Sequence, residues 1–505
     1  MNKFKIGQIK EEKYISPELH SQFIEFLGNC ISEGIWVGED SLIPNYKGMR
    51  KGVVDAMKRL APPVVRWPGG CYADMYHWRD GIGSKNERKV TWNENFGTYE
   101  QEENEFGTHE FMEFCKMICA KPWLNVNMLR GSVEEMVEWA EYCNRSEATT
   151  LSGERERNGS KEPFNVEYWG LGNECWAGGG NYTAEGYAAE YRKYASAMPN
   201  FKPADFLNPI EGLELKMIAC GPDGNKPKER VNWTKDFFSS LGKYRTPQID
   251  GYDLHFYNWN LNNQNEADWY RVINSCKELE EVIEEQYHLI QEGISNFPEV
   301  EGDFPGAPVT CKLIIGEWGN WHWSAFVNRP ALFQQCTMRD AITTAMTLDI
   351  FHRNSDKVSM ACVAQTVNVL NALIITQGEY TILTPNYYVF EMYKVHRGGH
   401  ATELEMIESH ENIYSFASVK DNIISISIVN ADIDAEQEIT LTMDCPAEVI
   451  CGRVLKSDSP DACNDAEHPN RVITKQAQSP VSGNIFDWVI RVPAASVSVY
   501  QFKKE

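Results

Sequence analysis

The sequence is short of positive charge. It contains 48 Lys and Arg residues against 72 Asp and Glu residues, which gives a formal net charge of −24 over 505 residues. Such a charge repels phosphate backbones and the anionic surface of a bilayer, so we expect neither nucleic acid nor a membrane as a partner. A neutral or cationic ligand suits this composition better.

Long apolar runs are also missing. No segment has the roughly 20 uninterrupted apolar residues that a membrane-spanning helix needs. The first five residues, Met1 to Lys5, lack the apolar core of a secretory signal. We therefore expect a soluble, cytoplasmic protein, provided that no export signal precedes the first residue.

Metal-binding spacings are absent as well. The 14 cysteines are scattered along the chain, with no CxxC pair and no cluster of histidines at the spacing of a zinc site. Several lie within apolar runs, as Cys115 and Cys119 do, which indicates reduced thiols in a protein core. We predict no structural metal and no cofactor.

Apolar and aromatic residues are plentiful. Hydrophobic residues make up 42% of the chain and aromatic residues 12%, which is enough for packed interiors. The length exceeds that of one ordinary core, so we expect a large domain and at least one smaller domain.

Short apolar runs alternate with longer amphipathic stretches from about residue 18 to about residue 380, a pattern typical of repeated β/α units. Eight runs are predicted to be strands, and eight parallel strands close a barrel. The stretches between them repeat apolar residues at helical spacing, as Val53, Met57 and Leu60 do. We therefore predict an α/β fold with a (β/α)8 TIM barrel over residues 16–384. The predicted strands are 20–26, 63–68, 122–127, 165–173, 216–221, 250–256, 311–317 and 358–365.

The pattern changes after Pro385. Short alternating strands, such as 422–429 and 495–502, are separated by turns rich in Asp, Pro and Gly, which predicts a C-terminal β-sandwich over residues 385–505. Residues 1–15 contain one more predicted strand that could pair with this sheet. The acidic stretch from residue 94 to residue 105 is predicted to be a solvated loop.

Two glutamates close predicted strands. Glu174 follows the apolar run of the fourth strand and Glu317 that of the seventh, and barrels of this type carry their working residues at the carboxyl ends of the strands. Retaining glycoside hydrolysis needs two carboxyl groups about 5–5.5 Å apart. A single glutamate after a strand is more often a helix cap or an ion-pair partner, but two of them, both flanked by tryptophans, favour a catalytic pair.

Five segments together resemble the α-L-arabinofuranosidases of glycoside hydrolase family 51. The resemblance covers most of the barrel, and the order of the segments makes it specific. It implies a (β/α)8 barrel with a C-terminal β-sandwich, and a retaining enzyme that releases terminal α-L-arabinofuranosyl groups from arabinose-containing oligosaccharides or polysaccharides by double displacement. The segments are Glu33–Asp40, Arg66–Cys71, Asn104–Met112, Trp169–Glu174 and Val367–Leu370.

The resemblance also implies roles for single residues. Glu174 would be the acid/base and Glu317 the nucleophile. Asn173 would hydrogen-bond the sugar hydroxyl beside the anomeric carbon, where contacts strengthen in the transition state. Arg66 would keep Glu317 ionised and oriented, and Glu25 would accept hydrogen bonds from sugar hydroxyls deep in the pocket.

Four further residues belong to the site that the resemblance implies. Tyr257 would contact the nucleophile or the sugar, His255 would support the site, and Gln365 would bind the sugar. A core histidine and an amide bonded to the backbone are the structural alternatives for His255 and Gln365. Cys71 stands where many relatives have a sugar-contacting asparagine, and a thiol is a weaker hydrogen-bonding group. The loop 95–99 replaces a tryptophan-containing loop of the family.

Two alternatives remain at the level of the sequence. An endo-β-1,4-glucanase or a β-xylosidase could use the same two glutamates on the same barrel. A non-catalytic glycan-binding protein could keep the barrel without turnover, although it would not need the whole set of site residues. The expected partner is an arabinofuranosyl-containing glycan, and the resemblance implies a homo-oligomer, such as a hexamer.

Overall fold

A computed structural model describes residues 2–201, 212–243, 247–261, 266–298, 309–408 and 410–504. The chain folds into two compact units. The first comprises Ser21–Tyr257 and Glu284–Trp318, and the second comprises Met1–His20, Asn258–Ile283 and Gly319–Glu505.

Eight strands close a barrel in the order β10-β11-β12-β13-β2-β5-β8-β9. The pairs β2/β5, β5/β8, β8/β9, β9/β10 and β10/β11 are parallel. All eight predicted strands and the TIM barrel are therefore confirmed. The strands are β2 (Ser21–Phe23), β5 (Val64–Trp67), β8 (Lys121–Val126), β9 (Tyr168–Leu171), β10 (Lys216–Asp223), β11 (Gly251–Leu261), β12 (Lys312–His322) and β13 (Val358–Val363).

Two strands are longer than the sequence predicted. β11 runs to Leu261 and β12 to His322, whereas the predicted ends were residues 256 and 317. Every residue of β12 after Lys312 is buried, so the polar side chains along it lie inside the protein and do not mark its end. Glu317 therefore lies within β12 and not at its end.

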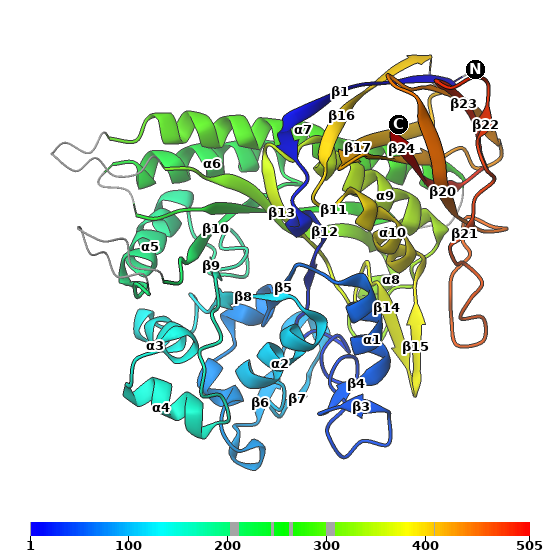
Figure 1. Cartoon of the computed structure of the whole chain (residues 1–505). Coiled ribbons are helices and arrows are strands. Elements are labelled where there is room, and N and C mark those ends of the chain that lie inside the picture. The colour runs from blue at the N-terminus through cyan, green and yellow to red at the C-terminus, as the bar shows by residue number, and fades with distance from the viewer. Residues whose placement is uncertain are drawn as a thin grey trace. The chain divides into compact units, whose positions relative to one another are not determined.

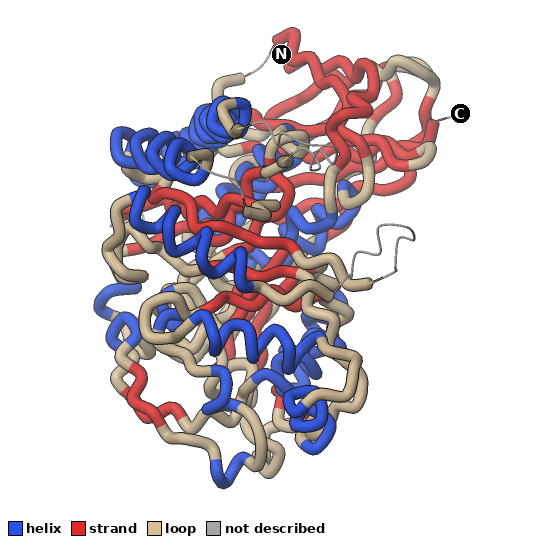
Figure 2. Tube along the Cα trace, turned by 90° about the vertical axis from the view of Figure 1, so that its left-hand side faces the viewer, coloured by secondary structure: helices blue, strands red, loops and turns tan. Residues whose placement is uncertain are grey.

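Helices flank the strands of the first unit (Figure 2). α1 buries Val53, Met57 and Leu60, as their spacing predicted. α3 begins where the Ser132 hydroxyl accepts a hydrogen bond from the Glu135 backbone N–H, a normal N-terminal cap. The helices are α1 (Lys51–Leu60), α2 (Thr108–Ile118), α3 (Val133–Asn144), α4 (Thr150–Arg157), α5 (Ala184–Ala197) and α6 (Pro227–Leu241), with the short hairpin β6 (Thr91–Asn93) and β7 (Glu100–Glu102).

The second unit contains a ten-stranded sheet in the order β21-β20-β24-β18-β17-β16-β1-β19-β23-β22. β1 pairs antiparallel with β16 and parallel with β19, so the first strand of the chain is an inner strand of this sheet (Figure 1). The strands are β1 (Asn2–Tyr14), β16 (His400–Glu408), β17 (Ile413–Lys420), β18 (Ile423–Asn430), β19 (Gln437–Thr442), β20 (Ala447–Lys456), β21 (Lys475–Gln476), β22 (Val481–Ser482), β23 (Asp487–Val492) and β24 (Ser496–Lys504).

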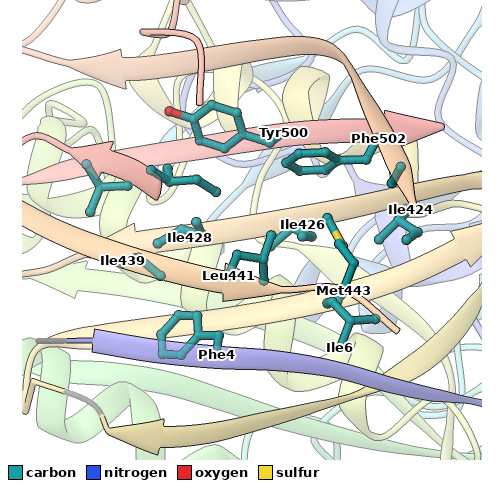
Figure 3. Packing of buried hydrophobic residues seen from close by; sticks show 14 of the residues in the cluster. Phe4, Ile6, Ile424, Ile426, Ile428, Ile439, Leu441, Met443, Tyr500 and Phe502 are labelled. Carbon is teal, nitrogen blue, oxygen red and sulfur yellow. The ribbon is translucent and has the colours of Figure 1, made fainter. Parts of the chain in front are cut away.

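Strands that are distant in this sheet share one hydrophobic core, so the sheet folds over itself as a sandwich (Figure 3). The isoleucines of β18 alternate toward this core, while Ser427 on the opposite face donates a hydrogen bond to Asp349 of α9 (Met338–Arg353). Both faces of β18 are thus covered. The core includes Phe4, Ile6, Ile424, Ile426, Ile428, Ile439, Leu441, Met443, Ile490, Tyr500 and Phe502.

The change to strands comes later than predicted. Pro385 opens a helix, α10 (Pro385–Tyr393), and the first strand after it begins at His400. Proline is well suited to the first turn of a helix because that turn needs no backbone N–H donor. The other helices of this unit are α8 (Ser324–Val327) and part of α7 (Glu266–Ser295). The domain boundaries 16–384 and 385–505 stay predictions.

The structure also bears on the predictions for the cysteines, the acidic stretch and membrane-spanning helices. All 14 cysteines are free, but only nine are buried, and Cys119 at the end of α2 is exposed. The acidic stretch 94–105 is not a fully solvated loop, because Glu102 in β7 is buried. Within the described part of the chain, no helix combines the length and apolar character required to cross a bilayer.

Candidate active site

The barrel brings the two predicted glutamates together. Glu174 lies three residues beyond the end of β9, and Glu317 lies on β12. A carboxylate oxygen of each, and a ring nitrogen of His255, lie within 4.8 Å of one another. This closeness fits the retaining arrangement, with carboxyl groups about 5–5.5 Å apart, and not the wider separation of about 6.5–9.5 Å in inverting enzymes.

Both oxygens of Glu317 accept hydrogen bonds. Arg66 Nη1 donates to Oε1 over 2.9 Å, and the Tyr257 hydroxyl donates to Oε2 over 2.7 Å. The Arg66 guanidinium is fully buried, so its charge acts on Glu317 with little screening and holds the carboxyl group in place. Burial and the charge of Glu317 raise the pKa of Tyr257 well above its usual value, which keeps its hydroxyl a donor.

Arg66 also orients Asn173. Its Nη2 donates to Asn173 Oδ1 over 2.7 Å, so the amide oxygen is occupied and the amide N–H2 group points the other way. That group lies 3.8 Å from Cys71 Sγ. Asn173 is therefore held as a hydrogen-bond donor next to the catalytic pair.

Glu174 has a different environment. Its backbone adopts a left-handed conformation, with φ of 40°, which is unusual for a residue other than glycine. His255 Nδ1 hydrogen-bonds Glu174 Oε1 over 3.0 Å, and Cys71 Sγ donates weakly to Oε2 over 3.7 Å. No arginine or lysine pairs with this carboxyl group among the described residues, so its contacts differ from those of Glu317.

His255 connects the pair to Asp253. Its Nε2 hydrogen-bonds Asp253 Oδ2 over 3.3 Å, and Asp253 Oδ1 accepts the backbone N–H of Gly316 over 2.6 Å. Burial disfavours the charged imidazolium, but the charges of Glu317 and Asp253 outweigh it and raise the pKa of His255 well above its usual value. Asp253 thus fixes both the ring and the strand that carries Glu317.

Glu25 lies two residues after β2 and is buried. Its Oε1 accepts hydrogen bonds from the backbone N–H groups of Gly70 (3.1 Å) and Tyr72 (2.9 Å) and from Asn95 Nδ2 (3.0 Å). Burial and the nearby charge of Glu317 raise the pKa of Glu25 to about 7. The carboxyl group is therefore available in both protonation states near neutral pH.

A glycine allows this close packing. A Cβ atom on Gly70 would lie 2.4 Å from Glu317 Oε1 and 3.3 Å from Asn173 Oδ1. Only glycine lets the backbone approach Glu317 so closely. The Arg66–Cys71 segment therefore supplies a charge, a backbone donor and free space in one short loop.

Eight of the nine predicted site residues lie in the first unit, joined by the contacts described above. The ninth, Gln365, is buried two residues after β13 in the second unit, and its sugar-binding role stays a prediction. Sequence reasoning gave no role to Asp253 or Asn95. The sequence could have indicated Asp253, because residues 253, 255 and 257 lie on the same face of β11 and the other two were predicted site residues.

Within the described ranges, the one group of histidine and carboxylate side chains at metal-ligand spacing is Glu174, His255 and Glu317. These atoms already bond to Arg66, Tyr257 and Asp253. The buried charge of Arg66 also disfavours a cation there. We assign no metal to this group.

Comparison with known proteins places the chain among the arabinofuranosidases. Residues 56–275 match the domain family described as "Alpha-L-arabinofuranosidase 1 domain", and residues 316–496 match "Alpha-L-arabinofuranosidase C-terminal domain". The "Intracellular exo-alpha-L-arabinofuranosidase" of Bacteroides ovatus is 34% identical over 507 residues, covering 96% of this chain and 92% of the relative.

Solved structures agree with these matches. The arabinofuranosidase of glycoside hydrolase family 51 from Xanthomonas axonopodis pv. citri aligns over 100% of both chains with a TM-score of 0.87 and 29% identity. The α-L-arabinofuranosidase of Thermotoga maritima, solved as an arabinose complex, aligns over 100% of both chains with a TM-score of 0.81 and 26% identity. The chain belongs to glycoside hydrolase family 51, among its α-L-arabinofuranosidases.

Proposed function

We propose that this protein hydrolyses terminal α-L-arabinofuranosyl linkages with retention of configuration, and that Glu317 is the nucleophile and Glu174 the acid/base. The observation that carries the assignment is the unequal environment of two adjacent carboxyl groups. Glu317 is paired with Arg66 and Tyr257, whereas Glu174 is bonded to His255 and a thiol. An ionised nucleophile and a proton-carrying acid require this difference.

In the first step Glu317 attacks the anomeric carbon while Glu174 protonates the departing glycosidic oxygen. The bond from the sugar to its aglycone breaks, and an ester forms between the sugar and one oxygen of Glu317. The hydrogen bonds from Arg66 and Tyr257 aim the attacking carboxylate. Glu174 is left ionised.

In the second step Glu174 accepts a proton from water, and the water oxygen attacks the anomeric carbon. The ester bond breaks, Glu317 leaves as a carboxylate, and the sugar departs with its original configuration. His255 lies 3.0 Å from Glu174 Oε1, where a charged ring stabilises the ionised form of the base.

The remaining residues hold the sugar. Asn173 offers its amide N–H2 group next to the pair, where it can donate to the hydroxyl beside the anomeric carbon. Glu25 offers a buried carboxyl group that can accept or donate near neutral pH. For Gln365, the resemblance to the family implies that it also binds the sugar.

The decisive assay compares two aryl glycosides, 4-nitrophenyl α-L-arabinofuranoside and 4-nitrophenyl β-D-xylopyranoside, with a chromogenic soluble glucan. We expect turnover of the arabinofuranoside, with NMR of the first product showing retained configuration. The relatives above carry arabinofuranosidase names, which favours this outcome over a glucanase or a β-xylosidase. Faster release of xylose or glucan fragments, or an inverted product, would refute the assignment.

Two finer points belong to the same proposal. The Bacteroides ovatus relative is named intracellular, and we expect this protein to work in the cytoplasm, on oligosaccharides. We also expect a homo-oligomer, such as a hexamer, which light scattering after size-exclusion chromatography would test.

A further inference from the structure

Asp74 is a buried carboxyl group that the mechanism above does not use. It ends the short 3-10 helix Cys71–Asp74, and only 3% of its surface is exposed. No described residue gives either of its oxygens a hydrogen bond of normal geometry. The backbone N–H of Met128 acts on this carboxyl group and favours its ionised form. An ionised carboxylate with so little compensation is unfavourable away from water.

The charges around Asp74 also oppose its ionisation. Burial and then the negative charge of Glu174 raise the pKa of Asp74 well above its usual value, and Glu25 adds to this. Arg66 acts in the opposite direction but already pairs with Glu317. Asp74 also affects the pKa of Cys71, Cys175 and Tyr182, and none of these groups is cationic.

A glycine places Asp74 next to the loop that carries Glu174. A Cβ atom on Gly179 would lie 1.7 Å from the backbone oxygen of Asn173 and 3.0 Å from Asp74 Oδ2. The two oxygens therefore flank the same small space. Two acceptors facing each other repel, whereas a protonated carboxyl group can donate to a carbonyl oxygen.

That carbonyl belongs to the residue just before a tight turn, which begins at Glu174. The backbone oxygen of Glu174 accepts hydrogen bonds from the N–H groups of Ala177 (2.8 Å) and Gly179 (3.2 Å). Glu174 itself has a positive φ, and such a conformation persists only when its surroundings hold it. A donor to the carbonyl of Asn173 would fix the start of this turn.

We propose that Asp74 is a positioning residue that works as a neutral carboxylic acid, donating its O–H to the backbone carbonyl of Asn173 and so holding Glu174 in place for proton transfer. This inference rests on the acid/base role proposed for Glu174. The backbone N–H of Met128 also acts on this carboxyl group, so a protonated Asp74 would link the loops after β8 and β9.

Two substitutions of Asp74 test whether its hydrogen-bond donor or its charge is what matters for activity. Asp74→Asn keeps a donor and an acceptor without a charge, and Asp74→Ala removes both. For an unactivated arabino-oligosaccharide, we expect Asp74→Ala to lower kcat/KM by about tenfold or more, because general-acid catalysis contributes about 10²–10⁴-fold. For an aryl arabinofuranoside with an acidic phenol, the loss should be much smaller. Asp74→Asn should restore kcat/KM for both substrates.

Equal losses on both substrates, or an Asp74→Asn variant as impaired as Asp74→Ala, would overturn the proposal. Infrared difference spectra of the wild type against Asp74→Asn give a second measurement that needs no activity. Other protonated carboxyl groups cancel in the difference, so we expect one carbonyl band of a protonated carboxylic acid at neutral pH that the wild type contributes, and its absence would also overturn the proposal. If Glu174→Ala shows no dependence on the leaving group, the proposed function fails instead, whatever the infrared result.

Discussion

At the scale of single residues, the two carboxyl groups proposed to be catalytic differ in their contacts. Glu317 accepts hydrogen bonds from a buried guanidinium and a phenol. Glu317→Gln keeps the size of the side chain and one acceptor oxygen, but it cannot form a stable glycosyl ester. We expect kcat to fall by about 10⁴-fold or more on every arabinofuranoside, with little change in the midpoint of thermal unfolding. Substantial residual turnover would mean that another group is the nucleophile.

The role of Glu174 can be tested by varying the leaving group of the substrate. A poor leaving group needs its oxygen protonated as the bond breaks, whereas an activated phenolate departs unaided. For Glu174→Ala we therefore expect kcat/KM to fall by about 10²-fold or more on arabino-oligosaccharides and far less on aryl glycosides with acidic phenols. Initial rates across a series of phenols would measure this difference.

Added azide provides the control for that experiment. Azide needs no deprotonation, so it should accelerate turnover of the Glu174→Ala variant and give an arabinofuranosyl azide of retained configuration. The Glu317→Gln variant should not give this product. If azide has no effect on a folded Glu174→Ala protein, Glu174 is not the acid/base.

At the scale of elements, the turn after β9 depends on one glycine. A Cβ atom on Gly179 would come within 1.7 Å of a backbone oxygen, while one on the adjacent Gly178 would meet nothing within 4 Å. We expect Gly179→Ala to displace Glu174 and lower kcat on oligosaccharides by about tenfold or more, since small misplacements cost up to about 10²-fold. Gly178→Ala should stay close to the wild type. Equal activity of the two variants in the same assay would show that the turn tolerates the shift.

The elements themselves were predicted with mixed accuracy. All eight barrel strands were found from apolar runs, because burial on both faces leaves a continuous apolar signal. β11 and β12 extend to Leu261 and His322, beyond their predicted ends at residues 256 and 317. The polar residues that suggested an end of β12, such as Glu317, are buried inside the strand. The helix at Pro385 was missed because proline was taken as the end of a pattern and not as the first residue of a helix.

At the scale of the whole molecule, buried carboxyl groups should couple stability to pH. Burial raises the pKa of Glu102 from 4.5 to about 7. Between these values the folded protein binds more protons than the unfolded chain, so the free energy of unfolding decreases as pH rises, by up to about 1.4 kcal/mol per pH unit for one group. Glu102→Gln cannot titrate. Its midpoint of thermal unfolding should therefore fall less than that of the wild type between pH 4.5 and 7.

The exposed neighbour Glu103 gives the matched control, because Glu103→Gln changes the same formal charge without burial. The melting curves of this control should follow the wild type at every pH. Parallel pH dependence of the wild type and Glu102→Gln would contradict the role given to Glu102.

Taken by itself, the sequence determined the fold class and predicted which two glutamates form the catalytic pair. Hydrophobic periodicity is a local property, so eight apolar runs and the helical spacing between them could be counted along the chain. The resemblance to family 51 then assigned Glu174, Glu317 and most of their neighbours, and the comparisons support that family.

Only the tertiary structure decided how those residues work. The hydrogen bond from Arg66 to Glu317 joins residues 251 positions apart, and that from Asn95 to Glu25 joins two loops. Asp74 has no local pattern that marks it as a neutral acid, because its pKa depends on burial and on Glu174. Distances, burial and charge arise when the barrel closes, and for this reason the sequence could name the site residues but not their protonation or their partners.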